Sequence, residues 1–521
     1  MRRGPRGDAR GTSRDDERSR YGFPRTGDEC GTHLTLLPVL LPLLLLLTRP
    51  ATADVVVDVV PYVDSDAWSG EHVAALRDFL SWCERHRVRV AAFHYNLCER
   101  TAPGITQVIR EFANRGVITL VGSHSASHAM GGLPPAVQYW ELVVSLDFLR
   151  REVGRSDPVL SVPYWVLDVN TVRACAMAGV RVIVDGNDPA LLGPEPGPWS
   201  SVPALSRRLV VGWWEVDGRR VYRLPAVAWA DLWGEERSVE RACERVREAV
   251  AELVRRGWCR EGALTVWVLV HPWELARSGF LESFEGFLDR VRSGGLDFEC
   301  GGVRVRFRLA DPREVVDRVK EYVARPLPSP DLLRILQAEG FLSPDQLQVE
   351  LVRGLLEGRE DAVKGLRVLE VWRRCMRILW GVDGELLALT RAGRVTGRLR
   401  GLVEKVVSEV WNDVGVYSAI REWGNLDAAL VFARRMLSDV MELAGAVESA
   451  YAELVASRGS GKGSPGRGSR RRPWVVPVPP FRPVRRGRGG PRRPGRGRAR
   501  RRRPGPRGAP GGRGRAVGAR A

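Results

Sequence analysis

The sequence predicts an α/β protein built on a parallel sheet or barrel and followed by an all-helical C-terminal domain. Between residues 54 and 325, short β-branched runs alternate with amphipathic helices, and the strand-like runs are apolar on both faces. Strands of that kind are typical of a parallel sheet covered by helices. Beyond residue 326 the apolar periodicity becomes almost purely helical. In such a fold we expect the active residues at the carboxyl ends of the strands.

The expected elements follow one another in order. We expect strands at residues 54–60, 88–94, 117–121, 159–163, 180–184, 209–213, 264–270 and 303–309. We expect helices in the first domain at residues 72–86, 105–113 and 137–152. The strands are assigned from short β-branched runs and the helices from apolar residues at helical intervals.

A proline-rich linker at residues 326–330 opens the helical domain, which we expect to extend to residue 456. Ser-Pro-Asp at 329–331, and again at 343–345, predicts two helix starts, because serine accepts hydrogen bonds at an N-cap and proline fits the first turn. The domain contains one cysteine and no histidine, so its sequence indicates no chemistry.

Residues 1–53 are predicted to be a leader and secretory signal peptide. An arginine-rich stretch precedes a leucine-rich run at 34–48, and Ala-Thr-Ala follows at 51–53. The apolar run is shorter than the roughly 20 residues that span a bilayer. We therefore expect a secreted or cell-surface protein, with anchoring in a membrane by an uncleaved signal as the alternative.

The net charge of +19 comes from the ends of the chain. Residues 457–521 contain 22 Lys and Arg and no acidic residue, while residues 1–53 contain 9 basic and 6 acidic residues, which leaves −6 for the body. The basicity therefore indicates nothing about the partner of the folded part. Nucleic-acid binding by the tail, through phosphate contacts, is a minor alternative because export is expected. The Arg-, Gly- and Pro-rich tail is predicted to be disordered and to be solvated or to bind polyanions or the cell envelope. A shifted reading frame in a GC-rich gene is another origin for this composition.

Seven cysteines follow residue 53, without a C-x-x-C pair or a regular spacing. A cysteine zinc site is therefore not expected. Export would permit disulfides, but the spacing does not indicate their pairing, and an odd number leaves at least one thiol free or intermolecular.

A histidine pair is the sharpest feature of the sequence. His124 and His128 lie four residues apart, directly after the expected strand at 117–121. At helical spacing these positions share one face, so both imidazoles can reach one metal ion. The serines between them could brace the ring nitrogens that do not bind the metal. The alternative is two exposed or hydrogen-bonded loop histidines; we predict a metal site.

Three aspartates near the first strand are candidates for a third ligand and for a general base. Asp58 interrupts an otherwise apolar strand, and a buried carboxylate needs a partner or a metal to offset its desolvation. Asp64 and Asp66 follow in the loop, where an ordinary turn or helix cap is the alternative. One carboxylate would bind the metal and another would act as base.

His271 closes the strongest apolar strand of the body. By itself such a residue is more often a structural histidine. Because it ends a core strand at the edge that already holds two candidate ligands, we predict that it is a general acid.

The order of these motifs is similar to that of the polysaccharide deacetylases, the NodB homology domain of carbohydrate esterase family 4. His124 and His128 resemble the H-[S/T]-x-x-H metal motif of that family. Val-Pro-Tyr, ending at Tyr164, resembles its proline-aromatic loop, and Leu-Val-His, ending at His271, resembles its late L-x-H motif. The resemblance covers residues 54–322. It implies a distorted seven-stranded (β/α) barrel that removes N- or O-acetyl groups from chitin, peptidoglycan or related glycans.

The resemblance also implies a mechanism. A divalent ion, zinc in our prediction, would polarise the carbonyl of an acetylated glycan, held by the histidine pair with Asp64 and Asp66 as candidate ligands. Asp58, by preference, would act as base. The backbone amide of Tyr164 would help to hold the oxyanion, and His271 would protonate the leaving group.

Two positions depart from the family pattern. The adjacent Asp-Asp pair is absent, since Asp58 is followed by Val59. The arginine expected before the proline-aromatic loop is Ser161, which removes a residue that normally orients the base. The division of roles among the three aspartates therefore stays open.

Two other functions are compatible with the sequence. A glycoside hydrolase on a related barrel would need two acids that flank the glycosidic bond. Its candidate acids are Glu215, Asp217, Asp231, Glu235 and Glu236. The other alternative is a non-catalytic glycan-binding or envelope protein that keeps the fold.

Overall fold

The computed structural model describes residues 54–188, 202–259, 263–322, 325–327, 342–421 and 424–459. All of them belong to one compact unit, Met1–Pro465. The predicted leader and signal peptide at 1–53, the predicted helix start at 329–331 and residues 460–521 of the predicted tail lie outside these ranges.

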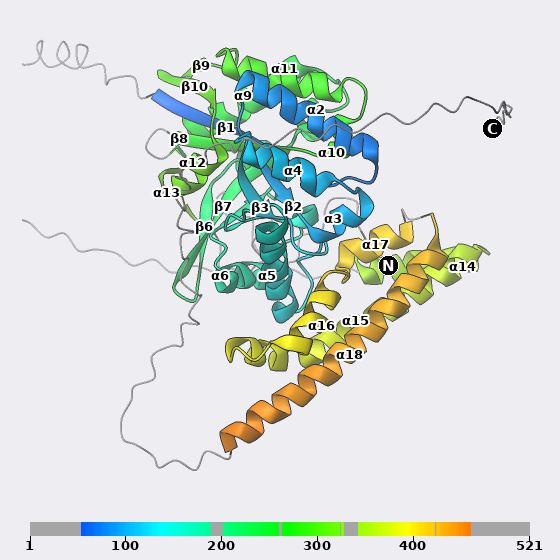
Figure 1. Cartoon of the computed structure of the whole chain (residues 1–521). Helices are drawn as coiled ribbons and strands as arrows, with labels where there is room; N and C mark the ends of the chain where they lie inside the picture. The colour runs from blue at the N-terminus through cyan, green and yellow to red at the C-terminus, as the bar shows by residue number, and fades with distance from the viewer. Residues whose placement is uncertain are drawn as a thin grey trace, which may run out of the picture. The chain divides into compact units, whose positions relative to one another are not determined.

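Seven parallel strands close into a barrel, which confirms the predicted fold class (Figure 1). Each strand pairs with the next, and the last, β8, pairs with β1. The barrel strands are β1 (Asp54–Asp64), β2 (Val90–His94), β3 (Ile118–Ser123), β4 (Val159–Ser161), β5 (Val182–Asp185), β7 (Arg219–Ala228) and β8 (Ala263–Val270).

Four further strands extend the sheet outside the barrel. They are β6 (Gly212–Val216), β9 (Phe298–Cys300), β10 (Val303–Leu309) and β11 (Arg325–Pro326). β10 pairs in parallel with β1, and β11 pairs with β6, so the chain remains on the sheet where the linker was predicted to begin.

The predicted strand at 209–213 overlaps β6 only at Gly212 and Trp213, and β6 is not a barrel strand. β6 and β7 form an antiparallel hairpin whose turn contains Asp217 and Gly218, both with positive φ. Asp-Gly is a strong signal for a hairpin turn, because that turn requires left-handed backbone. β7, which the sequence analysis missed, continues from this turn into the barrel.

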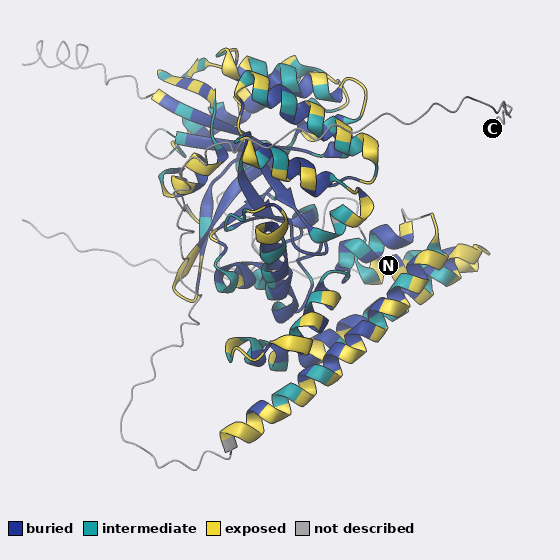
Figure 2. Ribbon diagram, in the orientation of Figure 1, coloured by how far each residue is buried: buried dark blue, intermediate teal, exposed yellow. Residues whose placement is uncertain are grey.

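Side chains alternate between two apolar cores along each barrel strand. On β1, Val57, Val59 and Val63 pack outward against helices, whereas Val60 and Tyr62 belong to the core inside the barrel. The barrel strands are the most thoroughly buried part of the fold, and the exposed residues gather on the helices around them (Figure 2).

Helices surround the barrel. They are α2 (Gly70–His86), α3 (Asn96–Thr101), α4 (Ile105–Asn114), α5 (Pro135–Glu152), α6 (Val169–Ala178), α7 (Ala204–Arg208), α8 (Trp229–Trp233), α9 (Val239–Arg255), α10 (Pro272–Leu275), α11 (Phe280–Arg292), α12 (Pro312–Asp317) and α13 (Val319–Tyr322). Side chains of α12 and α13 join the core inside the barrel.

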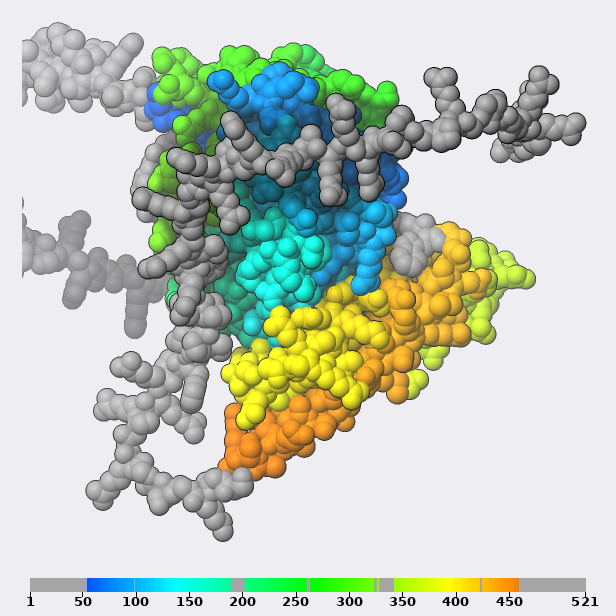
Figure 3. All heavy atoms as spheres, viewed as in Figure 1, coloured from blue at the N-terminus to red at the C-terminus, as the bar shows by residue number. Residues whose placement is uncertain are grey.

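The C-terminal region is helical, as predicted. It consists of α14 (Pro344–Leu356), α15 (Glu360–Arg391), α16 (Gly397–Val407), α17 (Asp413–Arg421) and α18 (Leu426–Gly459), of which α18 is prominent in Figure 3. Ser343 caps α14 as expected, since its side chain accepts a hydrogen bond from the Gln346 amide. α18 continues to Gly459, slightly beyond the predicted start of the tail.

The helical region shares a core with α5 of the barrel domain. Trp140 donates its indole N–H to Thr390 at 3.0 Å, and Asp383 accepts a hydrogen bond from the Ala136 amide at 2.7 Å. A surface ion pair, Arg400 with Asp147, adds to this contact at 2.7 Å. The two regions therefore pack directly on each other.

Two further features concern the predicted export. Within the described ranges, no helix is both long and apolar enough to cross a bilayer, and the apolar run at 34–48 lies outside those ranges. The cysteines whose side chains are described are free thiols: Cys83, Cys175, Cys243, Cys259, Cys300 and Cys375.

Candidate metal centre

The carboxyl ends of the barrel strands bring together most of the predicted site residues. Asp64 ends β1, and Asp66 follows it in the loop to α2. His124 and His128 follow β3, and His271 directly follows β8. Because parallel strands end at one edge, residues from distant parts of the sequence meet here.

Asp66, His124 and His128 form a cluster that can hold a metal ion, with ligand atoms that all lie within 4.8 Å of one another. The Nε2 atoms of the two histidines are 3.0 Å apart. Oδ1 of Asp66 lies 3.5 Å from Nε2 of His128 and 3.9 Å from Nε2 of His124. Three converging N and O donors of this kind suit a divalent ion such as zinc.

The histidines reach this position from a loop and not from a helix. Ser125 and His128 have positive φ, 62° and 65°, and residues 124–130 carry no helical backbone. Left-handed backbone is uncommon outside glycine and costs energy, so the surrounding structure has to hold it. The i, i+4 spacing therefore identified the right pair, although the backbone that brings the two rings together is different.

The ring orientation of His124 is set by Ser161. Nδ1 of His124 lies 2.9 Å from the carbonyl oxygen of Ser161. A carbonyl oxygen can only accept a hydrogen bond, so Nδ1 carries the proton and the lone pair of Nε2 faces the cluster. Burial lowers the pKa of His124 to about 3, with His128 adding to the effect, and burial also lowers that of His128 to about 3. Neutral imidazole is the form that binds metals.

One carboxylate oxygen of the cluster is buried and makes no hydrogen bond. Oδ1 of Asp66 is buried and has no hydrogen-bond partner, and the same holds for Oδ1 of Asp64. Buried polar atoms normally have a partner, because desolvation is otherwise uncompensated. The donor set and the orphaned Asp66 oxygen therefore both fit a cation.

Asp64 lies beside the cluster and is held by Ser161. Its Oδ2 accepts a hydrogen bond from the Ser161 hydroxyl at 3.1 Å, and its Oδ1 lies 3.7 Å from Nδ1 of His124. Burial raises the pKa of Asp64 to about 8; His271 opposes this shift and Asp66 adds to it. Ser161 thus orients the carboxylate from the position where an arginine was expected.

His271 lies on another side of Asp66, with Nε2 3.8 Å from Asp66 Oδ2. Its Nδ1 is 2.8 Å from Glu274 Oε2, which also accepts a hydrogen bond from the His271 amide at 2.9 Å. Burial acts to lower the pKa of His271, but Glu274, followed by Asp66 and Asp64, raises it to about 9. These carboxylates therefore favour the protonated form of the imidazole.

Tyr164 stands at the rim of the same site. It belongs to a short turn, Pro163–Trp165, and has positive φ, 51°. Its ring centroid lies 4.5 Å from that of His128, whose other contacts include the stacked ring of Tyr95 at 4.7 Å. The proline-aromatic loop therefore reaches the histidine pair.

Asp58 is not brought to this site. It points into the barrel, as Asp64 does, but lies six residues upstream, about 20 Å along the strand at roughly 3.3 Å per residue. Its carboxylate pairs with Arg308 Nε at 2.6 Å and accepts a hydrogen bond from the Tyr322 hydroxyl. Protein groups thus compensate the buried charge of Asp58, and its placement does not support the predicted role as base.

Two acidic residues that support the site were missed in the sequence. Glu141 on α5 is fully buried and accepts hydrogen bonds from the amides of Ala126 and Ser127, at 2.8 and 2.9 Å, and from the Ser127 hydroxyl at 2.6 Å. Ser127 therefore braces the loop and not the histidine rings. Glu274 is the second of these residues. In the sequence, both could have been found as acidic residues within otherwise apolar segments, since a buried carboxylate needs a partner.

His94 is a third missed residue. It ends β2, is fully buried, and lies 2.6 Å from the Ser65 hydroxyl and 2.8 Å from the Thr106 hydroxyl. Because Ser65 stands between Asp64 and Asp66, His94 holds the loop that carries both carboxylates.

The acids proposed for a glycoside hydrolase do not form a buried pair. Glu215, Asp217, Asp231, Glu235 and Glu236 are all exposed. Asp217 occupies the β6–β7 turn, and Glu236 lies near the guanidinium groups of Arg241 and Arg245.

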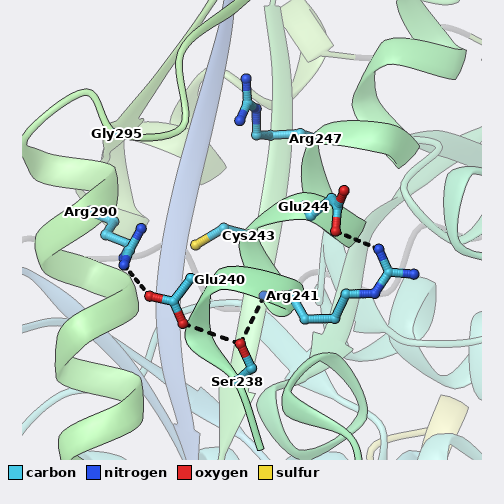
Figure 4. Close-up of a pocket in the computed structure, with 8 residues that line it drawn as sticks. All are labelled: Ser238, Glu240, Arg241, Cys243, Glu244, Arg247, Arg290 and Gly295. Atoms are coloured by element: carbon cyan, nitrogen blue, oxygen red, sulfur yellow. Dashed lines mark hydrogen bonds and ion pairs between the residues drawn. The ribbon is translucent and has the colours of Figure 1, made fainter. Parts of the chain in front are cut away.

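A hollow of about 390 Å³ lies between α9 and α11 (Figure 4). Two ion pairs lie in its lining, Arg290 with Glu240 and Arg241 with Glu244. Asp66, His124 and His128 are not among the residues that line it.

Neither a protein-family model nor a curated protein matches the chain. Among solved structures it is similar to a 4-alpha-glucanotransferase from Thermococcus litoralis, at 12% identity and a TM-score of 0.47, over 73% of this chain and 60% of that one. It is similar to a putative polysaccharide deacetylase from Mycobacterium smegmatis, at 17% identity and 0.37, over 54% and 96%. It is also similar to an alpha-mannosidase from Enterococcus faecalis V583, at 10% and 0.44, over 77% and 43%. At sequence identities and TM-scores this low, the similarity gives no argument for the function of this chain, which is inferred from the site.

Proposed function

We propose that this protein is a metal-dependent deacetylase that hydrolyses N- or O-acetyl groups on a glycan. The observation that carries the proposal is the convergence of Asp66, His124 and His128 on one point, with Asp64 and His271 beside them. A metal site flanked by one further carboxylate and one imidazole contains the groups that acyl hydrolysis needs.

Asp66, His124 and His128 would hold the ion, for which we propose zinc. Neutral imidazoles and a carboxylate are the ligands that catalytic zinc sites use, with positions left open for substrate and water. A divalent cation supplies Lewis acidity there, which polarises a carbonyl and acidifies water.

The protein's own groups would then divide the proton transfers. Asp64, oriented by the Ser161 hydroxyl, would accept a proton from water, in the role that the sequence analysis gave by preference to Asp58. A nearby cation favours the ionised carboxylate that this role requires. His271, held by Glu274, would donate a proton to the departing amine or alkoxide. The Tyr164 amide is our candidate for the oxyanion donor.

The proposal extends to the setting of the enzyme. A secreted or cell-surface location, as the signal-like leader suggests, would place it beside polysaccharide substrates. The basic tail would then add affinity for polyanions or the cell envelope.

Acetate release from chitooligosaccharides and peptidoglycan fragments, with and without a chelator, tests the proposal beside a reducing-sugar assay. We expect acetate that depends on metal. Asp64→Asn should lower kcat at least ~10²-fold as a lost base, whereas Asp58→Asn, a matched change of a buried aspartate on the same strand, should retain turnover.

Each other outcome would overturn the proposal in a specific way. Reducing ends without acetate would identify a glycoside hydrolase. Bound metal with neither product would favour a non-catalytic glycan-binding or envelope protein.

A further inference from the structure

We propose that Trp68 and Trp273 form a binding platform for a second sugar ring of an N-acetylated hexosamine oligosaccharide. This inference rests on the proposed function and names a subsite beside its metal centre. Trp68 lies in the loop between β1 and α2, and Trp273 in α10, directly after β8. β1 and β8 are neighbours in the barrel, so both side chains stand at the edge that carries the site.

The two indoles form a continuous set of ring contacts with the candidate acid. The centroids of His271 and Trp273 are 5.4 Å apart with nearly parallel planes, and those of Trp273 and Trp68 are 5.8 Å apart. Trp68 is also only two positions from the ligand Asp66. A sugar over Trp68 can therefore belong to the same oligosaccharide as one at the metal centre.

Exposure distinguishes Trp68 from the other large apolar side chains of the barrel domain. It is 57% exposed, and every other large hydrophobic residue with comparable exposure in the described ranges lies beyond residue 348, in the helical region. Trp68 is nevertheless positioned: its amide donates to Nδ1 of His72 at 3.1 Å, and the two rings meet edge to face. An exposed, oriented indole beside a site marks a ligand surface more than a packing residue.

The chemistry of the patch fits a pyranose ring. A pyranose has apolar C–H faces, which stack on an indole, and hydroxyl and acetamido groups at its edge, which need polar partners. The exposed guanidinium of Arg277 lies 4.3 Å from the Trp273 ring and brings several N–H donors to the edge of the patch. Two indoles and one arginine are far too small a surface for a stable protein partner, which needs about 800 Å² on each side.

Calorimetric titration of the metal-free full-length protein with chitotetraose and with monomeric N-acetylglucosamine tests this platform without turnover. We expect the wild type to bind the tetramer more tightly than the monomer. Trp68→Ala should weaken tetramer binding about tenfold, the loss expected for one aromatic contact. Trp68→Phe should recover most of the affinity.

Trp380→Ala is the matched control, because Trp380 is 49% exposed but lies on α15 in the helical region. Three results would each overturn the platform. Trp68→Ala could bind the tetramer as tightly as the wild type, Trp380→Ala could lose as much tetramer affinity as Trp68→Ala, or the wild type could fail to bind the tetramer. Acetate release by the metal-loaded wild type is measured separately. Trp68-dependent binding without acetate would retain the platform and reject the deacetylase, and acetate without Trp68-dependent binding would do the reverse.

Discussion

Replacing Glu141 with glutamine should remove a loss of stability that the wild-type protein undergoes as the pH rises. Burial raises the pKa of Glu141 from 4.5 to about 8, and the three hydrogen-bond donors around it only partly oppose this shift. The protonated acid also fits its surroundings. The Ser127 hydroxyl lies 2.6 Å from Oε1 and 3.1 Å from the Val410 carbonyl oxygen. When Glu141 is protonated, this hydroxyl can donate its one hydrogen to Val410 and accept the proton of the acid.

The direction of the pH dependence of stability follows from whether the folded or the unfolded protein binds the proton of Glu141 more tightly. Because the pKa is higher in the folded protein, the contribution of Glu141 to stability is full below about pH 4.5 and is lost as the pH rises through 8. The slope is about 1.4 kcal/mol per pH unit within that window, so roughly 3 kcal/mol should be lost between pH 5 and pH 8. Glutamine reproduces the hydrogen bonds of the protonated acid and does not titrate.

Urea unfolding of both proteins at a series of pH values, with chelator present, measures this effect. The free energy of unfolding of Glu141→Gln minus that of the wild type should increase by roughly 3 kcal/mol from pH 5 to pH 8. Glu370→Gln, the same change on the exposed face of α15, should show no such increase. A difference that stays constant with pH would refute the reasoning, because it would mean that Glu141 is ionised throughout.

Three further predictions concern the site. His128→Ala should abolish stoichiometric zinc binding in metal analysis of the folded protein, while His86→Ala, a histidine outside the cluster, should retain it; equal occupancy would remove the metal assignment. Glu274→Gln should shift the alkaline limb of the kcat–pH profile to lower pH. A general acid works below its pKa, and Glu274 raises the pKa of His271. If the limb does not move, His271 is not the acid. His94→Phe should weaken zinc binding about tenfold, because the Asp64–Asp66 loop loses its support; an unchanged dissociation constant would assign His94 to packing alone.

The sequence by itself determined the class of fold and the barrel edge at which the candidate site residues lie. β-branched runs and helical periodicity are local properties, visible within a window of one element, and they sufficed to predict strands, helices and their alternation. Since parallel strands end at one edge, residues placed just after strands are brought together by the fold class itself. That is why Asp64, Asp66, His124, His128 and His271 could all be selected without knowing a distance.

Tertiary structure alone decided what each of these residues contacts. Asp58 and Asp64 are acids at positions of the same parity on β1, which extends to Asp64 and not only to residue 60 as predicted, but they stand at opposite ends of the barrel. The partners of Asp58, Arg308 and Tyr322, lie 250 and 264 residues away. Glu141, from α5, likewise becomes part of the site through contacts with a loop 14 and 15 residues earlier. Whether a buried carboxylate meets a guanidinium, a set of amides or a histidine pair depends on packing between distant segments, and no local periodicity records that choice.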